Sequence, residues 1–457
     1  MIGAGIKDVR MRRRERMKKT WKQKIEAATL ALMLSVSCAA CGSGNGENGT
    51  NDTVQTGNET DSNVGTEGLE GTQSGENAPG GNAVTIDDLL AECTYLDKEM
   101  YERATAYPEG DISRIAAALR KAEAGEAVTI GVIGGSITQG SSASSQDSCY
   151  ASLLKKWWEE TFPQSEITFI NAGVGSTTSY LGVHRVEEDL LSYEPDLVIV
   201  EFGVNDANSN FYKKSYDNLV RRIMMEEYNP AVLLLFMTME DGTSAQGNQS
   251  LIGFQYEIPM ISYGNIVLDE IKEGSFTWDD ISPDNIHPNN MGHAIVAETL
   301  DVYLTDIYNR LDEIETEVTP FNKDVITKEV YMDATILYAD DIEPIQWGSF
   351  EVADINSRFP GNWYTESGEE SLIFEVEAAN IGIMYQEMVN GGGGKYEVYV
   401  DGEHVTTLNA DFANGWGDYS EAYEIYTSAE RTMHTVEIKK AEDSEGSVFA
   451  LLGLLIS

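Results

Sequence analysis

The stretch "VTIGVIGGSIT", residues 128–138, decides how the fold is interpreted. Its first half is an apolar run rich in β-branched residues, which predicts a buried strand. The run stops at Gly134 and Gly135, and Ser136 follows directly. Glycine and serine both favour turns, so Ser136 is either an ordinary loop serine or a nucleophile presented at the tip of a strand. The rest of the sequence is needed to distinguish a loop serine from a nucleophile.

Three similar apolar runs follow, separated by stretches with the composition of helices. The runs are "ITFIN" (167–171), "DLVIVEF" (196–202) and "AVLLLFM" (231–237), and "IPMIS" (258–262) is a candidate fifth strand. The stretches between them include "YASLLKKWWEE" (150–160) and "KSYDNLVRRIMMEEY" (214–228). Apolar runs that alternate with helices predict a parallel sheet covered on both faces. Residues 84–319 are therefore expected to form an α/β domain.

The pattern changes after about residue 319, where apolar and polar residues begin to alternate. The clearest examples are "SLIFEVEAANIGIMYQ" (371–386), "KYEVYVDGEHVTTLN" (395–409) and "MHTVEIKKA" (433–441). The Asp401-Gly402 pair is a strong signal for a hairpin turn. We expect residues 320–457 to form an antiparallel β-sandwich of the jelly-roll type. Its tryptophans either fill the core, which is the commoner case, or offer flat faces to sugar rings: Trp347, Trp363 and Trp416.

The amino-terminal residues 1–41 resemble a bacterial lipoprotein signal peptide. A basic segment "MKKTWKQK" (17–24) precedes a short apolar segment "AATLALMLSVS" (27–37), which is too short to span a membrane. Cys41, which follows two alanines, is the expected lipidation site, with Cys38 as the alternative; an ordinary secretory signal without lipid is the other possibility. Residues 42–83 have almost no apolar content and predict a disordered tether. The protein is therefore expected outside the cell, on a bacterial surface, with its lipid as the only membrane contact.

The composition limits the possible partners. The chain has 457 residues and a formal net charge of −45, which argues against nucleic acid as a partner. No His-Glu-x-x-His stretch or paired-cysteine motif is present, so neither a metal nor another cofactor is expected. The acidic character favours solubility but names no substrate.

Polar or glycine-rich residues follow each of the first three apolar runs. They are "GGSIT" (134–138), "NAGVGSTTS" (171–179) and "GVND" (203–206), and "SPDNIHPNN" (282–290) follows the sheet. Because ligands bind at the carboxyl ends of parallel strands, these residues should meet on one rim. A serine nucleophile needs a base, and His287, three residues after Asp284, is the best placed of five histidines. The carboxylate would fix the tautomer of the imidazole.

Taken together and in this order, the four motifs resemble the SGNH (GDSL-like) hydrolase superfamily over roughly residues 110–310. The resemblance implies a three-layer α/β/α fold with Ser136 as nucleophile, His287 as general base and Asp284 as its orienting partner. The first motif departs from the GDSL spelling, with Gly135 before the serine and Ile137 after it. This departure leaves the nucleophile in place.

The resemblance also implies an oxyanion hole. Asn205 would donate its side-chain amide and Ser136 its backbone N–H. A further backbone N–H would come from the second motif, where the alignment leaves Gly175 or Ser176. The neighbouring Asp206 is expected to support the Asn205 loop. The loop "EDGTSAQGNQS" (240–250) is a candidate wall of the substrate pocket.

The two-part organisation resembles bacterial carbohydrate esterases with an attached carbohydrate-binding or jelly-roll domain. It implies a serine esterase that removes O-acyl groups, chiefly O-acetyl, from an acetylated polysaccharide or oligosaccharide at the cell surface. A lipid-directed acylhydrolase and a non-catalytic glycan-binding lipoprotein are the alternatives. Because all four motifs are retained, the catalytic interpretation is favoured.

Overall fold

The α/β part is built on a five-stranded parallel sheet. A computed structural model of the protein describes residues 84–457, and the sheet has the order β2-β1-β3-β4-β5. Its strands are β1 (Val128–Gly134), β2 (Ile167–Gly173), β3 (Leu197–Glu201), β4 (Ala231–Phe236) and β5 (Met260–Ser262). The predicted fold class is thus confirmed, including the fifth strand, and all neighbouring strands pair in parallel.

The register of β1 with its neighbours β2 and β3 brings the carboxyl ends of these three strands to one level. Gly134, the last residue of β1, pairs with Gly173 on one side and with Glu201 on the other. These are also the last residues of β2 and β3. The three loops that follow these strands therefore leave the sheet at the same rim, side by side.

Helices cover both faces of the sheet, because alternate residues of its strands enter two separate apolar clusters. One face packs against α3 (Lys98–Ala104), α4 (Ser113–Glu123), α6 (Tyr150–Thr161), α10 (Tyr263–Glu273) and α12 (Asn290–Asn309). The other face packs against α7 (Ser179–Asp189), α8 (Asn210–Met224) and α9 (Gln246–Tyr256). Three short helices complete this part: α2 (Ile86–Leu90), α5 (Ser136–Gln139) and α11 (Trp278–Ile281).

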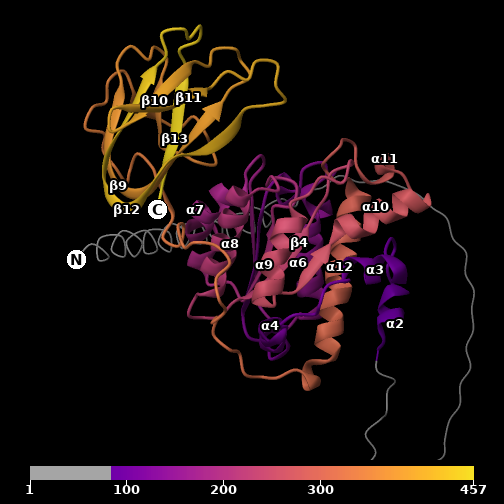
Figure 1. The fold of residues 1–457 in the computed structure, drawn as a ribbon. Coiled ribbons are helices and arrows are strands. Elements are labelled where there is room, and N and C mark those ends of the chain that lie inside the picture. The colour runs from indigo at the N-terminus through magenta and orange to yellow at the C-terminus, as the bar shows by residue number, and fades with distance from the viewer. Residues whose placement is uncertain (1–83) are drawn as a thin grey trace, which may run out of the picture. The chain divides into compact units, whose positions relative to one another are not determined.

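The second part is an eight-stranded antiparallel sheet that curls around its own core, drawn in orange to yellow in Figure 1. Its order is β11-β10-β12-β9-β13-β8-β7, and β6 pairs with β13. The register between the long strands β9 and β12 shifts at Glu424/Tyr426 and at Thr427/Thr432. Such irregularities bend a sheet. The strands are β6 (Thr335–Leu337), β7 (Glu351–Ala353), β8 (Asn362–Thr365), β9 (Leu372–Glu387), β10 (Lys395–Val400), β11 (Glu403–Asn409), β12 (Tyr419–Lys440) and β13 (Phe449–Ile456).

The predicted hairpin at Asp401-Gly402 joins β10 to β11. Val400 pairs with Glu403, so only two residues form the turn. Both have positive φ angles, +54° for Asp401 and +82° for Gly402. A two-residue hairpin turn of this type matches the twist of the strands, and Asp-Gly is among the sequences that adopt it most readily.

The two sheets share an apolar cluster. Side chains of α7 and α8, among them Leu181 and Leu219, pack in one cluster with Tyr331, Met384 and Leu455 of the second part. This shared core fixes how the β-sheet part meets the α/β part. The division at residue 319 stays a prediction, and the predicted signal peptide, Cys41 and tether lie outside the described residues.

Among residues 84–457, no helix has the length and apolar character needed to cross a membrane.

Candidate active site

Ser136 is the first residue of α5, immediately after β1. The two preceding glycines are required by close packing at the rim. A Cβ atom on Gly134 would lie 2.4 Å from the carbonyl oxygen of Glu201, and one on Gly135 would lie 2.2 Å from Oδ1 of Asn205. Both distances are far below van der Waals contact. The two glycines of the first motif therefore allow the nucleophile loop, formed by Gly134, Gly135 and Ser136, to lie directly against the loop that follows β3.

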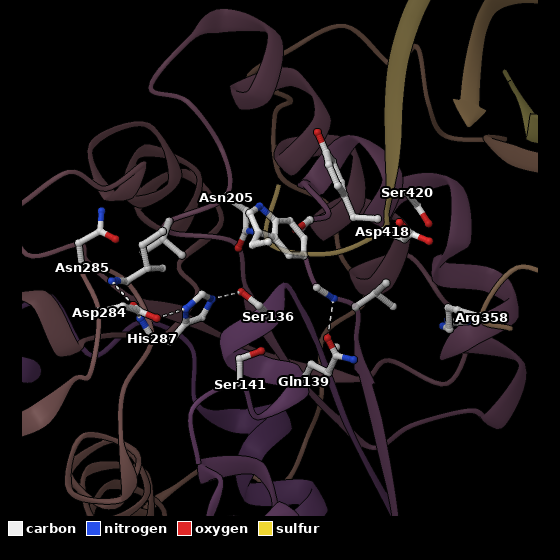
Figure 2. A pocket seen from close by; sticks show the side chains of 18 of the residues that line it. Ser136, Gln139, Ser141, Asn205, Asp284, Asn285, His287, Arg358, Asp418 and Ser420 are labelled. Atoms are coloured by element: carbon white, nitrogen blue, oxygen red, sulfur yellow. Dashed lines mark hydrogen bonds and ion pairs between the residues drawn. The ribbon is translucent and has the colours of Figure 1, made fainter. Parts of the chain in front are cut away.

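Ser136, His287 and Asp284 form a hydrogen-bonded chain (Figure 2). The Ser136 Oγ atom lies 2.9 Å from Nε2 of His287, and Nδ1 of His287 lies 2.9 Å from Oδ2 of Asp284. The other carboxylate oxygen of Asp284 accepts the backbone N–H groups of Ile286 and His287, at 2.8 and 2.7 Å. Partial burial acts to raise the pKa of Asp284, but the hydrogen bonds from His287 and Ile286 outweigh it, and the pKa is lowered. An ionised Asp284 can therefore hold Nδ1–H and leave Nε2 free to accept from the serine.

The other four histidines are occupied elsewhere. His293 lies behind the nucleophile loop, where Nε2 is 3.2 Å from the Ser141 carbonyl oxygen and Nδ1 accepts the Tyr150 N–H. Burial lowers the pKa of His293 to about 4 and that of His184, on α7, to about 3. His404 and His434 belong to β11 and β12. Of the five histidines, only His287 contacts Ser136.

The structure distinguishes between Gly175 and Ser176, the two candidates from the sequence for the backbone donor of the oxyanion hole. The Gly175 N–H donates to Oε1 of Gln139 at 2.8 Å. The backbone N–H groups of Ser136 and Ser176, by contrast, have no hydrogen-bond partner within residues 84–457. Ser176 has a φ angle of +57°, a conformation that glycine adopts more easily. Ser176 rather than Gly175 thus offers a free N–H, next to Ser136 and the Asn205 side chain in the same cavity.

Glu201, at the end of β3, is a buried residue that the sequence analysis missed. Its carboxylate accepts hydrogen bonds from the Thr138 hydroxyl at 3.0 Å and from the Gly203 N–H at 3.2 Å. Burial raises its pKa to about 7, although these bonds and those from the Gly135 and Thr138 N–H groups oppose the rise. One buried carboxylate thereby ties the nucleophile loop to the loop of Asn205. The available signal was Glu201 itself, a charged residue between Val200 and Phe202 in the apolar run "DLVIVEF".

Asp206 ties the Asn205 loop to the second motif. It is buried; Oδ1 accepts the Ser179 N–H at 2.9 Å, and Oδ2 accepts from the Gln249 side chain at 3.2 Å. Burial raises the pKa of Asp206 to about 7. These contacts agree with the expected supporting role.

The site opens into a cavity of about 680 Å³ whose wall comes from both parts of the chain. The α/β part contributes the predicted site residues and their neighbours. The β-sheet part contributes Asn356, Arg358, Trp416, Asp418, Tyr419 and Ser420. None of the residues 240–250, proposed from the sequence as a wall, lines this cavity, and residues 246–250 form the start of α9. The second sheet forms the wall instead.

Of the tryptophans in the second part, one fills the core and another offers an exposed face, the two alternatives that the sequence left open. Trp363 is fully buried in the core of the sheet. Trp416 is 69% exposed and stacks on Tyr419, with ring centroids 5.1 Å apart and an angle of 29° between the planes. The cavity therefore has an open aromatic face on the side of the second sheet.

Two of the charged groups around the cavity are paired. Asp284 contacts His287, and the Arg358 guanidinium lies 2.5 Å from the carboxylate of Asp189 on α7. Asp418 accepts the backbone N–H of Val389 at 2.8 Å. Figure 2 shows Arg358 and Asp418 on the side of Ser136 away from Asp284. Within residues 84–457, no group of three or more His, Cys, Asp or Glu side chains could hold a metal ion.

Comparisons with known proteins agree with this geometry. The model of the GDSL-like lipase/acylhydrolase family matches residues 132–295, a range that includes Ser136, Asn205, Asp284 and His287. Thioesterase 1/protease 1/lysophospholipase L1 of Escherichia coli (strain K12) is 23% identical over 194 residues, 41% of this chain and 88% of that protein.

Two crystal structures of a two-domain esterase (CEX) active on acetylated mannans, one of them with mannopentaose, extend the similarity to both sheets. They are 34% and 35% identical, with TM-scores of 0.71 and 0.73. Each similarity covers 78% of this chain, and 97% and 98% of the respective esterase chains. The chain belongs to the GDSL-like lipase/acylhydrolase family and is an SGNH-type serine ester hydrolase with an appended antiparallel β-sheet domain.

Proposed function

We propose that the enzyme removes O-acetyl groups from a polysaccharide at the cell surface, with Ser136 as nucleophile. The observation that carries this proposal is the composition of the cavity. The chain of Ser136, His287 and Asp284 opens into a space whose lining also contains the exposed Trp416. An ester on a sugar can therefore contact the serine and an aromatic face at once.

The reaction follows from the hydrogen bonds of the site. Ser136 Oγ attacks the carbonyl carbon of the ester, and its proton passes to Nε2 of His287. The negative charge that develops on the carbonyl oxygen is stabilised by the Asn205 side-chain amide and by the N–H groups of Ser136 and Ser176. His287 then gives its proton to the sugar oxygen as the C–O bond breaks, which leaves an acetyl group on Ser136.

The second half of the reaction uses the same groups. A water molecule gives a proton to His287 and attacks the acetyl carbonyl carbon. The bond to Ser136 Oγ breaks, the serine recovers the proton from His287, and acetate leaves. Asp284 keeps the imidazole in the orientation that both halves require and stabilises its protonated form.

A neutral glycan fits the character of the cavity better than a charged substrate. Besides Arg358 and Asp284, which are paired, and Asp418, which accepts the Val389 N–H, the lining contains uncharged polar side chains, among them Gln139, Asn285 and Ser420. Such groups form hydrogen bonds with sugar hydroxyls, and Trp416 offers an apolar ring face. The similarity to an esterase active on acetylated mannans supports the same substrate class.

The proposed location rests on the amino-terminal sequence. A lipid on Cys41 and the tether 42–83 would hold the esterase away from the bilayer, where extracellular polysaccharide is accessible. Mass spectrometry of the mature amino terminus tests this part. A terminus without lipid, or one processed at Cys38, would contradict the assignment to Cys41.

The experiment that tests the activity is acetate release from a panel of acetylated polysaccharides, including mannan and xylan. We expect release from at least one glycan by the wild-type enzyme and none by Ser136→Ala. Lysophospholipid and acyl thioester substrates belong in the same panel. Turnover confined to these lipids would favour a lipid-directed acylhydrolase, and no turnover by the folded protein would favour a glycan-binding role.

A further inference from the structure

We propose that Gln139 is a positioning residue for the oxyanion hole. Its side-chain carbonyl holds the loop after β2 in the conformation from which the Ser176 N–H can donate. The inference rests on the proposed ester hydrolysis at Ser136, and it assigns a role to a residue outside the four motifs. Gln139 also links the tip of this loop, Gly175 and Ser176, directly to α5, the helix that begins with Ser136.

Gln139 is placed for this role by the short helix that begins with the nucleophile. It is the last residue of α5, three positions after Ser136, so the two side chains lie on one helical turn. Its Oε1 atom accepts the Gly175 N–H at 2.8 Å, drawn as a dashed line in Figure 2. A rotation of α5 would move Ser136 and this hydrogen bond together. The helix α5 therefore positions both Ser136 and the loop that carries the Ser176 N–H.

The base of the loop, at Gly173 where β2 ends, is held by contacts of other residues. Asn171 donates from Nδ2 to the Thr138 carbonyl oxygen at 2.8 Å and accepts the Gly173 N–H through Oδ1 at 2.8 Å. A Cβ atom on Gly173 would lie 2.3 Å from the backbone nitrogen of Gln139. The loop and α5 are therefore packed backbone against backbone at this level. Asn171 holds the base, and Gln139 holds the tip.

The tip needs such a tie because of its conformation. Ser176 has a φ angle of +57°, which is unfavourable for a residue with a Cβ atom and persists only where the surroundings enforce it. By binding the Gly175 N–H, Gln139 fixes the peptide group between Val174 and Gly175, one residue before the peptide group that carries the Ser176 N–H. It also satisfies the donor that is not needed and leaves the Ser176 N–H unpaired. The same contact thus orients the loop and selects its donor.

Gln139→Met tests the role, because methionine keeps the length of the side chain and removes the acceptor. Gln139 is exposed, so the melting temperature should stay close to that of the wild type. For an aryl acetate we expect kcat to fall about tenfold with KM within about twofold, less than the ~10²- to 10³-fold loss typical when an oxyanion donor is removed. Gln139→Ala should behave similarly.

A second readout separates positioning from general loosening of the site. The aryl thionoacetate carries sulfur in place of the carbonyl oxygen and gains less from oxyanion donors. Its kcat/KM should therefore fall less than that of the aryl acetate. The ratio of kcat/KM for the aryl acetate to kcat/KM for the thionoacetate should decrease in Gln139→Met. Gln255→Met, an exposed glutamine on α9, is the matched control and should change neither quantity.

The outcomes are distinct. An unchanged ratio with unchanged kcat in Gln139→Met overturns the proposal. An increase in kcat/KM overturns it as well, because Gln139 would then compete with the oxyanion for the Gly175 N–H. Failure of the wild-type enzyme to hydrolyse any ester would remove the proposed function and this role together, whereas a normal wild type with an unaffected variant removes only the role.

Discussion

The hydroxyl oxygen of Ser136 lies 2.9 Å from Nε2 of His287, although 151 residues separate them in the chain. Ser136 follows β1, an inner strand of the sheet, and His287 lies in the loop between α11 and α12. The parallel sheet makes the contact possible, since it presents the ends of its central strands at one rim. The contact also defines the first test of the mechanism.

Ser136→Ala and His287→Ala should each lower kcat by about 10⁴-fold or more. The serine forms the covalent bond and the histidine transfers the proton, so neither role can be taken over by a neighbour. Hydrolysis of an aryl acetate measures the loss, and circular dichroism verifies that both variants are folded. Full activity of Ser136→Ala would contradict the mechanism.

Asp284→Asn provides a graded comparison within this series. The Asp284 side chain is 43% exposed, and it orients His287 without reacting itself. We therefore expect a clear loss of kcat that remains smaller than that of His287→Ala. A variant as inactive as His287→Ala would show that the carboxylate is indispensable for proton transfer.

Gly135→Ala should impair catalysis through Asn205. The new methyl group would lie 2.2 Å from Oδ1 of Asn205 and displace the amide from the oxyanion. Asn205→Ala alone should cost ~10²- to 10³-fold in kcat. In the double variant the collision is absent, so Gly135→Ala should add little to the loss caused by Asn205→Ala. Additive losses in this double-mutant cycle would show that the glycine serves another purpose.

Much of the site could be predicted because its residues follow strands. Ser136, Asn205 and the second motif each come directly after an apolar run, and parallel pairing brings such positions together whatever the details of packing. Asp284 and His287 are three residues apart, so one turn of chain suffices for their contact. The hydrogen bond of Gln139 was not predictable in this way. Its partner is a backbone N–H whose position depends on how closely Gly173 lets two loops approach.

The wall from the second sheet could not be predicted for a different reason. Asn356 and Arg358 reach the cavity only because the two parts pack through the cluster that contains Tyr331, Met384 and Leu455. Tyr331 precedes the first strand of the second sheet, and Met384 and Leu455 lie on strands whose neighbouring residues enter the sheet's own core. The apolar character of these residues does not say whether they face their own sheet or a neighbouring domain. Glu201, by contrast, was detectable as a charge inside an apolar run.

Trp416→Ala should weaken the binding of an acetylated oligosaccharide but not of a small ester. The ring is 69% exposed and lines the cavity, so its removal takes away contact area for a sugar and little packing. We expect KM for an acetylated oligosaccharide to rise about tenfold, consistent with the ~1 kcal/mol scale of aromatic contacts. The aryl acetate kinetics should stay within about twofold.

Met433→Ala serves as the control for Trp416→Ala. Met433 lies on β12, is 61% exposed and does not line the cavity. Its removal should leave both substrates unaffected. Equal effects of Trp416→Ala on the oligosaccharide and the aryl acetate would show that Trp416 supports the site itself and not the glycan.

The buried carboxyl of Glu201 should make folding stability depend on pH. Its pKa is raised from the ordinary value of 4.5 to about 7, so the folded protein retains this proton where the unfolded chain has lost it. The contribution of the raised pKa is fully present below pH 4.5 and is lost as the pH rises to 7. Relative to Glu201→Gln, the free energy of unfolding of the wild type should therefore decrease by about 3 kcal/mol over this interval. Urea unfolding of both proteins at several pH values measures the difference, and a constant difference would contradict the prediction.

The last prediction concerns the length of the acyl group. The oxyanion donors fix where the ester carbonyl lies, and the lining mixes polar Gln139, Ser141 and Asn285 with the smaller apolar Val174 and Val204. A long alkyl chain would have to leave such polar groups without water, whereas an acetyl group fits beside them. Each methylene that the site cannot accommodate should cost ~1–3 kcal/mol, so kcat/KM should fall steeply with acyl length. Aryl esters with two to twelve acyl carbons measure this dependence, and we expect the maximum at two. A maximum at eight carbons or more would overturn the carbohydrate assignment in favour of a lipid substrate, because only an extended apolar path from Ser136 could hold such a chain.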